Sequence, residues 1–380
     1  MRFHNSTTTP KKILGESVNR FPFLSMLFIG VITLMMAPQA FASDKWFPAS
    51  IDIWEPPFND KRQRKNGQYT PVNKASKIWK ICVSIPHLKD AYWLAVNYGI
   101  IDQAKQLGVA VQLSEAGGYD NLALQRQKVK QCMSTGANGL ILSSISLDGF
   151  NDLIKKYVSE GRPVIDLING ISSDKLSARS AVTFWDNGYQ VAKYLVSKHK
   201  IQQGKIRVAW FPGPVGAGWV EAGNAGFRHG AREGSIQIIA TRFGDTGRES
   251  QTKLIEAVLN ETTDIDYIIG TTVTAEAAVK VLRRLKLSDK IKVLPYYYGP
   301  GIHKGIKRGY FQAAPSDMQS IQARIAVDQM VRILDGKPYL KHVAPKVMVI
   351  DRANIRQFDT STSLPPRGFR PVFSVNQWNR

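Results

Sequence analysis

The sequence predicts an α/β fold made of two doubly wound parallel-sheet domains joined by a hinge. Two observations support this prediction. The chain has 380 residues, of which 43% are hydrophobic and 10% aromatic, enough for two domains with cores of their own. Short apolar stretches alternate with segments of helical periodicity, in one run before residue 185 and another after it. Such alternation is typical of βαβ units, which build parallel sheets covered on both faces.

Residues 1–42 have the organisation of a secretory signal peptide. Basic residues come first, an apolar stretch at 21–36 follows, and the small-x-small sequence Ala40-Phe41-Ala42 precedes Ser43. An uncleaved membrane anchor is the alternative. However, the apolar stretch is short for the roughly 20 residues that a spanning helix needs, and no later segment approaches that length. We therefore expect export to the periplasm, cleavage, and a mature protein without a membrane span.

Residues 43–77 contain four prolines and a basic cluster at 61–65, and they lack a regular periodicity. Prolines interrupt helices and interior strands, so this composition does not favour a run of regular elements. We expect an N-terminal arm laid over the surface and not a separate domain.

The first run of strands and helices begins at residue 78. Residues 78–85 form a short apolar stretch suited to a buried strand, and 92–107 repeat apolar residues at helical spacing until Gly108 ends the helix. The same reasoning predicts, in order, a strand at 109–113, a helix at 122–133, a strand at 139–142, a helix at 150–158 and a strand at 163–167.

The second run resumes after Trp185. It predicts helices at 189–199, 220–232, 252–259 and 275–285, which alternate with strands at 207–211, 236–240, 267–270 and 292–296. A last helix at 322–334 and a strand at 347–350 are too few for a third domain, so we expect them to complete the first. The predicted organisation is an N-terminal α/β domain at 78–183 plus 314–342, a C-terminal α/β domain at 184–313, and a tail at 343–380.

Aromatic residues occupy the loops that should line the cleft between the two domains. In open α/β sheets, ligands bind at the carboxyl ends of the strands. Trp93 follows the first strand, Tyr119 follows a glycine pair after the second, Trp185 lies at the crossing between domains, and tyrosines fill 296–298. Core packing or a plain turn is the structural alternative for each, as helix capping is for Asp90. Only some of the three adjacent tyrosines can face the cleft.

Four aromatic loops that converge on one crevice would suit a quaternary-ammonium-like cation. Ring faces attract positive charge by about 0.5–2 kcal/mol per ring, depending on desolvation. An acid such as Asp90 would add attraction or hold a water molecule. A sugar site would instead need several polar side chains for the hydroxyls, and the candidates for that role are Asn169, Asp166, Arg248 and Asp317.

The sequence shows no constellation for catalysis, for a metal or for a cofactor. The glycine-rich residues 213–218 lack the Lys-Ser/Thr of a P-loop and are better interpreted as a strand-to-helix turn near the cleft. The six histidines do not have metal-ligand spacing, and no nucleophile is paired with a base. We therefore expect a binding protein and not an enzyme.

The net charge of +21 raises the possibility of a nucleic-acid partner. The basic residues are scattered apart from 61–65, and no nucleic-acid-binding motif accompanies them. With an export signal in the same chain, a solvated surface that faces anionic membrane or acidic partners is favoured over nucleic acid.

The chain has two cysteines, Cys82 and Cys132. An even number in an exported protein is compatible with a disulfide, since the oxidising compartment lets one persist. Two buried thiols are the alternative, and counting alone leaves both open.

Several motifs resemble those of the trimethylamine N-oxide sensors within the type I periplasmic binding protein family. They extend from about Trp79 to Val372 and cover residues 43–77 poorly. The matching segments are Lys89-Asp90-x-Tyr92-Trp93-Leu94-x-x-Asn97-Tyr98-Gly99, Glu115-Ala116-Gly117-Gly118-Tyr119, Gly226-Phe227-Arg228, Ala275-Glu276-Ala277-Ala278, Gly305-Ile306-Lys307-Arg308-Gly309 and Arg367-Gly368-Phe369-Arg370-Pro371-Val372.

The resemblance implies a function as well as the type I periplasmic binding protein fold. Such a protein binds trimethylamine N-oxide in an aromatic pocket between domains and signals to the periplasmic domain of a TorS-type sensor histidine kinase, which induces N-oxide respiration. The resemblance also implies that Cys82 and Cys132 form a disulfide. Carried over position by position, the ligand-binding residues are Trp93, Tyr119, Trp185, Tyr297 and Asp90, the last as a water-holding group.

The alternative function is a substrate-binding protein that delivers a sugar or a polyamine to an ABC importer. It would share the fold and differ in the pocket, where polar groups would replace rings. A cytoplasmic regulator of the same fold is disfavoured by the signal peptide and by the absence of a DNA-binding headpiece from the sequence.

Overall fold

The computed structural model describes residues 46–59, 63–199 and 204–376, which belong to one compact unit. The predicted signal peptide at 1–42 lies outside the described residues. Within the described ranges, no helix is both long enough and apolar enough to cross a bilayer.

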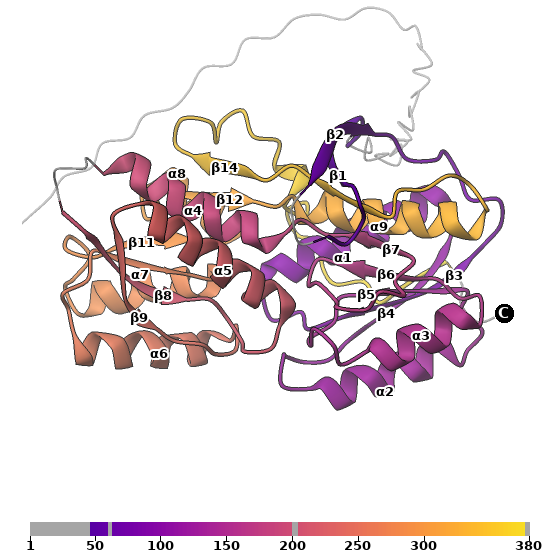
Figure 1. Cartoon of the computed structure of the whole chain (residues 1–380), viewed down its shortest axis with the longest axis horizontal. Coiled ribbons are helices and arrows are strands. Elements are labelled where there is room, and N and C mark those ends of the chain that lie inside the picture. The colour runs from indigo at the N-terminus through magenta and orange to yellow at the C-terminus, as the bar shows by residue number, and fades with distance from the viewer. Residues whose placement is uncertain (1–45, 60–62, 200–203, 377–380) are drawn as a thin grey trace, which may run out of the picture. The chain divides into compact units, whose positions relative to one another are not determined.

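An N-terminal lobe is built on a nine-stranded sheet with the order β15-β4-β3-β5-β6-β7-β13-β1-β2. Its parallel centre is formed by β4 (Ala110–Glu115), β3 (Lys80–Ile85), β5 (Gly139–Leu142), β6 (Val164–Leu167), β7 (Ala178–Ser180) and β13 (His342–Pro345). Helices α2 (Leu122–Met133) and α3 (Asn151–Ser159) cover one face, and α1 (Ala91–Leu107) and α9 (Gln319–Leu334) pack together on the other (Figure 1). The strands are almost wholly buried, as parallel strands between two helical layers must be.

A C-terminal lobe is built on a four-stranded parallel sheet with the order β11-β10-β8-β9. Its strands are β8 (Ile206–Phe211), β9 (Ile236–Thr241), β10 (Tyr267–Gly270) and β11 (Lys292–Pro295). Helix α4 (Phe184–Lys198) packs on α5 (Gly218–Glu233), and α6 (Arg248–Glu261) packs on α7 (Thr272–Arg284). The short helix α8 (Pro300–Arg308) leads into β12 (Ala313–Ser316), which pairs with β14 (Met348–Asp351). The predicted fold class, with two parallel sheets and helices on both faces, is confirmed.

The C-terminal end of the chain contains three strands, of which the sequence predicts β14, as the strand at 347–350, but not β13 or β15. Strand β13 joins the N-terminal sheet, β14 pairs with β12, and β15 (Ser374–Val375) pairs with β4 at the opposite edge. Strand β15 is only two residues long, too short for a periodic signal. The domain boundaries given above stay a prediction.

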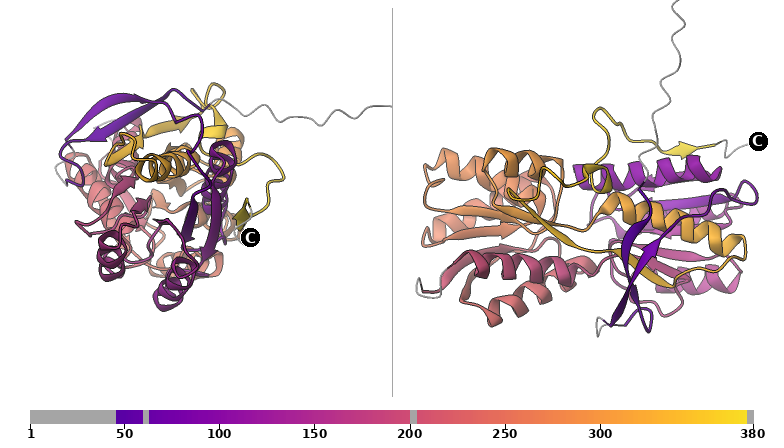
Figure 2. Two further views of the ribbon diagram at one scale, coloured as in Figure 1. Left: turned by 90° about the vertical axis from the view of Figure 1, so that its right-hand side faces the viewer. Right: turned by 90° about the horizontal axis from the view of Figure 1, so that it is seen from above.

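The N-terminal arm also differs from its prediction, because it contains a β-hairpin. Strands β1 (Ala49–Trp54) and β2 (Arg64–Tyr69) pair with each other, and β1 pairs with β13, so the hairpin extends the sheet. Trp46, Ile51 and Tyr69 are buried in one cluster with residues of α9. Figure 2 shows the indigo hairpin beside α9. The prolines that suggested irregular structure all lie outside the two strands.

The hairpin also contacts the C-terminal lobe through Arg64. The two terminal nitrogens of its guanidinium donate to the carboxylate of Asp186, in the first turn of α4, at 2.6 and 3.0 Å. Such a bidentate pair fixes direction as well as distance. The hairpin therefore anchors the beginning of the helix with which the chain enters the C-terminal lobe.

Two glycines let α4 and α5 approach within backbone contact. A Cβ on Gly188 would lie 2.1 Å from the carbonyl oxygen of Gly223, and one on Gly226 would lie 2.0 Å from that of Trp185. No side chain can be accommodated at either position without moving a helix. The close approach fixes the first turns of both helices relative to each other, and both turns contribute rings to the site described next.

The disulfide between Cys82 and Cys132 is confirmed. It joins β3 to the end of α2, with the two Cα atoms 6.1 Å apart. The bridge lies within the core cluster beneath α2 and α3.

Candidate ligand-binding site

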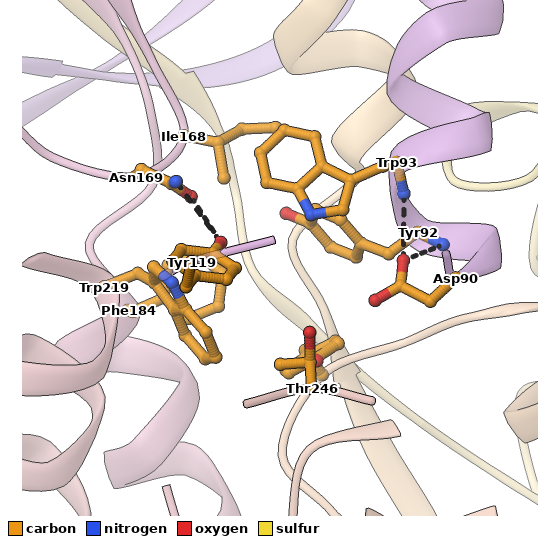
Figure 3. Close-up of a pocket in the computed structure, with 10 residues that line it drawn as sticks. Asp90, Tyr92, Trp93, Tyr119, Ile168, Asn169, Phe184, Trp219 and Thr246 are labelled. Atoms are coloured by element: carbon orange, nitrogen blue, oxygen red, sulfur yellow. Dashed lines mark hydrogen bonds between the residues drawn. The ribbon is translucent and has the colours of Figure 1, made fainter. Parts of the chain in front are cut away.

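An aromatic cavity lies where the carboxyl ends of strands from both lobes meet. Its volume is about 20 Å³, slightly more than the 10–15 Å³ or so that a single water needs. Figure 3 shows the rings turned toward a common space. The lining residues are Asp90, Tyr92, Trp93, Tyr119, Ile168, Asn169, Phe184, Trp219, Thr246 and Tyr297.

Helix α1 contributes Tyr92 and Trp93 from its first turn. Asp90 is the N-cap: one carboxylate oxygen accepts the backbone N–H groups of Tyr92 at 3.0 Å and Trp93 at 3.2 Å. The Tyr92 hydroxyl donates to the buried carboxylate of Asp317 at 2.5 Å. The capping role proposed as the alternative for Asp90 is therefore real, and it places the carboxylate at the edge of the cavity (Figure 3).

Burial gives the site two perturbed carboxyl groups. Loss of water around Asp90 raises its pKa to about 6, although its two backbone hydrogen bonds oppose the shift. Burial likewise raises the pKa of Asp317 to about 6, against the hydrogen bond from Tyr92. Both groups are predominantly ionised above pH 7, and a cationic solute would add to that ionisation.

Tyr119 comes from the loop after β4. Gly117 and Gly118 precede it with φ of 77° and 154°, a conformation that side-chain-bearing residues rarely adopt. The amide nitrogen of Asn169 donates to the Tyr119 hydroxyl at 3.3 Å and to the carbonyl of Ser144 at 2.7 Å. The glycine pair therefore turns the tyrosine into the cavity, and Asn169 holds its hydroxyl in place.

The C-terminal lobe contributes Trp219 and Phe184 from the first turns of α5 and α4. Their ring centroids are 5.4 Å apart, and Trp219 lies 5.9 Å from both Tyr119 and Tyr297. The indole N–H of Trp219 is buried and makes no hydrogen bond of good geometry within the described residues, although it interacts with the Tyr119 hydroxyl. A buried donor without a good hydrogen bond costs about 1–3 kcal/mol, so a solute oxygen that accepts this N–H would be favoured.

The three tyrosines at 296–298 have three different environments. Tyr297 lines the cavity, 5.3 Å from the ring of Tyr92. The Tyr296 hydroxyl donates to the carbonyl of Pro212 at 2.5 Å, and the Tyr298 hydroxyl is 2.6 Å from His303 Nδ1. Only the middle ring of the run lines the cavity, and its role in binding stays a prediction.

Trp185 requires a correction. It is not among the residues that line the cavity: its ring is stacked on Tyr189 at 4.8 Å and lies 5.3 Å from His229. The neighbouring residue Phe184 faces the cavity instead. Successive helical residues are about 100° apart around the axis, and on α4 this rotation turns Trp185 toward Tyr189 and His229.

Trp219 is not among the residues that the sequence predicts for the site, although the sequence contains a signal for it. The glycine-rich turn at 213–218 was placed near the cleft, and Trp219 is the next residue along the chain. Trp219, like Trp93 on α1, is a large ring in the first turn of a helix that follows a strand. Of the polar candidates, Asn169 lines the cavity, whereas Asp166 is buried elsewhere in an ion pair with Arg179 at 2.6 Å.

Comparisons with known proteins agree with this architecture. Residues 81–338 match the model of the periplasmic binding protein domain. The periplasmic protein TorT of Escherichia coli K12 is 36% identical over 305 residues, which cover 80% of this chain and 86% of TorT.

Two of the similar solved structures share more than 30% sequence identity with this chain. A solute-binding protein of an ABC transporter from Bradyrhizobium sp. BTAi1, with bound bis-tris, is 47% identical, with a TM-score of 0.76 and coverage of 86% of this chain and 98% of the other. TorT in complex with the TorS sensor domain, in the presence of trimethylamine N-oxide, is 31% identical, with a TM-score of 0.70 and coverage of 78% and 99%. The chain is thus periplasmic and belongs to the periplasmic binding protein family.

Proposed function

We propose that the protein is a periplasmic sensor component that binds trimethylamine N-oxide in the aromatic cavity. One observation supports this most: rings from both lobes surround a small cavity, with the carboxylate of Asp90 and the buried N–H of Trp219 at its boundary. The similarity to TorT, solved with the TorS sensor domain in the presence of this compound, supports the same choice.

The chemistry of the ligand matches the groups that line the cavity. The N-oxide has three methyl groups on a positively charged nitrogen and one anionic oxygen. The ring faces attract the methylated nitrogen, while the oxygen accepts a hydrogen bond from the Trp219 N–H or a tyrosine hydroxyl. Because the rings come from both lobes, the bound ligand would hold the lobes together, which a kinase domain can detect as a change of shape.

A sugar is a poor fit to the same cavity. A monosaccharide presents many hydroxyl groups, each of which needs a partner once buried. The lining offers mainly rings, and the side chains of Tyr92, Tyr119 and Asn169 already hydrogen-bond other residues.

Delivery of an amine to an importer is the second candidate function. It is favoured by the similarity to the Bradyrhizobium protein, which is described as belonging to an ABC transporter and is 47% identical. The two candidate functions use the same pocket. They differ in the partner protein that recognises the ligand-bound form.

Two measurements test these proposals. Calorimetric titration of the mature protein should show binding of trimethylamine N-oxide and none of ribose or spermidine; the reverse pattern would overturn the proposed ligand. Affinity capture with the loaded protein should then retain the periplasmic domain of a sensor kinase. Capture of an importer permease in its place would support transport.

Binding of a permanently charged methylammonium ion should weaken as the solution is acidified. Burial raises the pKa of Asp90 to about 6, so its carboxylate is ionised at pH 7.5 and mostly protonated at pH 5.5. The bound cation favours the ionised form, so protons compete with it, and affinity for choline should fall about fourfold over this range. Calorimetry at several pH values measures this fall.

The Asp90→Asn variant is the matched control for the pH dependence, because asparagine retains an N-cap acceptor. Its affinity should be lower and nearly independent of pH. His87, whose pKa burial lowers to about 4, does not titrate in this range. If the variant keeps the full pH dependence, the titrating group is another one, such as Asp317, and the role given to Asp90 is wrong.

A further inference from the structure

A second and larger cavity adjoins the aromatic one. Its volume is about 220 Å³, and it shares Asp90, Tyr92 and Thr246 with the aromatic cavity. Trimethylamine N-oxide, with few atoms, would leave this space to water. The two cavities therefore have room for a longer solute whose methylated nitrogen lies among the rings and whose other end lies beyond Asp90.

The lining of this polar cavity differs in character from that of the aromatic one. Two cations line it, Lys89 and Arg248, and each is only loosely paired. The Lys89 ammonium is 3.4 Å from Asp245, and the Arg248 guanidinium is 3.6 Å from Glu276, beyond normal hydrogen-bonding distance. Both cations thus retain N–H groups for a further acceptor.

Two carboxyl groups, those of Asp90 and Glu276, also line this cavity beside the two cations. Burial raises the pKa of Glu276, so water loss around this carboxyl group disfavours its charge. The N-cap residue of α6, Gly247, and the first-turn residues Arg248 of α6 and Gly301 of α8 also line the cavity, and neither N-cap residue donates or accepts a side-chain hydrogen bond. The Gly247 N–H already donates to Asp245, whereas the backbone N–H groups of Arg248 and Gly301 add to the donors that the Lys89 and Arg248 side chains supply.

We propose that the site takes zwitterionic methylammonium solutes, with the ammonium group in the aromatic cavity and a carboxylate in the polar cavity against Arg248 and Lys89. This inference rests on the proposed function, since the same rings hold the ammonium end. It extends that function by assigning the polar cavity to an anionic tail. Arg248 is the main determinant, because a guanidinium can bind a carboxylate through two parallel hydrogen bonds.

Three ligands with the same kind of headgroup separate the possibilities. Trimethylamine N-oxide has no tail, choline has a hydroxyl tail, and glycine betaine has a carboxylate tail of similar length. Calorimetric titration of the mature protein should show glycine betaine bound at least tenfold more tightly than choline. Replacement of the arginine, Arg248→Gln, should remove most of this advantage and leave the affinity for trimethylamine N-oxide within twofold of the parent value.

Arg284→Gln is the matched control. Arg284 pairs with Glu256 on the surface, and the two side chains are 61% and 33% exposed, against 61% and 34% for Arg248 and Glu276. This substitution removes the same charge from a similar ion pair, but Arg284 does not line the polar cavity. It should leave the affinities for all three ligands unchanged.

The outcomes distinguish failure of this inference from failure of the proposed function. If trimethylamine N-oxide binds but glycine betaine does not bind more tightly than choline, the carboxylate site is wrong and the aromatic site stands. If Arg248→Gln and Arg284→Gln reduce betaine affinity equally, the effect is one of overall charge and the assignment of Arg248 is overturned. If none of the three ligands binds, both proposals fail together.

Discussion

Replacing Trp219 with alanine should weaken binding of trimethylamine N-oxide by about 10- to 100-fold, equivalent to about 1.4–2.8 kcal/mol. The variant loses a ring face beside the methylated nitrogen, apolar contact area and a buried indole N–H that makes no hydrogen bond of good geometry within the described residues. Trp219→Phe retains a ring and loses the donor, so its affinity should lie between those of the parent protein and Trp219→Ala. Calorimetric titration measures all three.

Trp185→Ala is the control for this experiment. Both substitutions remove a tryptophan side chain from the first turn of a helix in the C-terminal lobe. The Trp185 ring, however, stacks on Tyr189 and does not line the cavity. The affinity of Trp185→Ala should stay within about twofold of the parent value. Equal losses in the two alanine variants would indicate a general change in the lobe, and an undiminished affinity in Trp219→Ala would show that the ligand binds elsewhere.

Removal of the disulfide by the double substitution Cys82→Ser and Cys132→Ser should lower the free energy of unfolding by about 2–4 kcal/mol. The bridge links residues 50 positions apart, so it restricts the unfolded chain, and it also fastens α2 to the central strand β3. Urea denaturation followed by circular dichroism measures the change. Two-state behaviour should be checked with a second probe.

Reduction of the parent protein provides the matching comparison. With reductant present, the parent should become about as unstable as the double-serine variant, and the variant itself should not respond to reductant. Equal stability of the oxidised parent and the variant would show that the bridge does not contribute to folding stability.

The long elements were predictable because their periodicity is determined locally. Helix α2 has the predicted bounds, Leu122–Met133, and α1 begins one residue before its predicted start. Apolar residues at helical spacing and a glycine stop are sufficient for such helices. The three-residue strand β7 has no such signal. Its conformation depends on hydrogen bonds with β6 and β13, and the sequence of β7 itself contains no information about these partners.

The aromatic cavity was predictable at the level of loops and not of every ring. Trp93, Tyr119 and Tyr297 lie in the loops that follow strands or at the start of the next helix, so the topology alone takes them to the cavity. The choice between Phe184 and Trp185 depends on the rotation of α4 about its axis. That rotation is determined by the backbone contact between Gly188 and Gly223 and by the ion pair from Arg64, neither of which a local pattern contains.

The β1–β2 hairpin has a consequence for where the chain can be shortened or joined to another protein. The segment that matches the family begins at residue 81, and a chimera designed on that boundary would lack both strands. The outer edge of β13 would then be unpaired, and exposed strand edges recruit strands from other molecules. The buried carboxylate of Asp328 would also lose the hydrogen bonds that it accepts from Tyr69 and from the backbone of Val72. The smallest autonomous folding unit of this protein therefore includes the β1–β2 hairpin, which precedes the segment that matches the family.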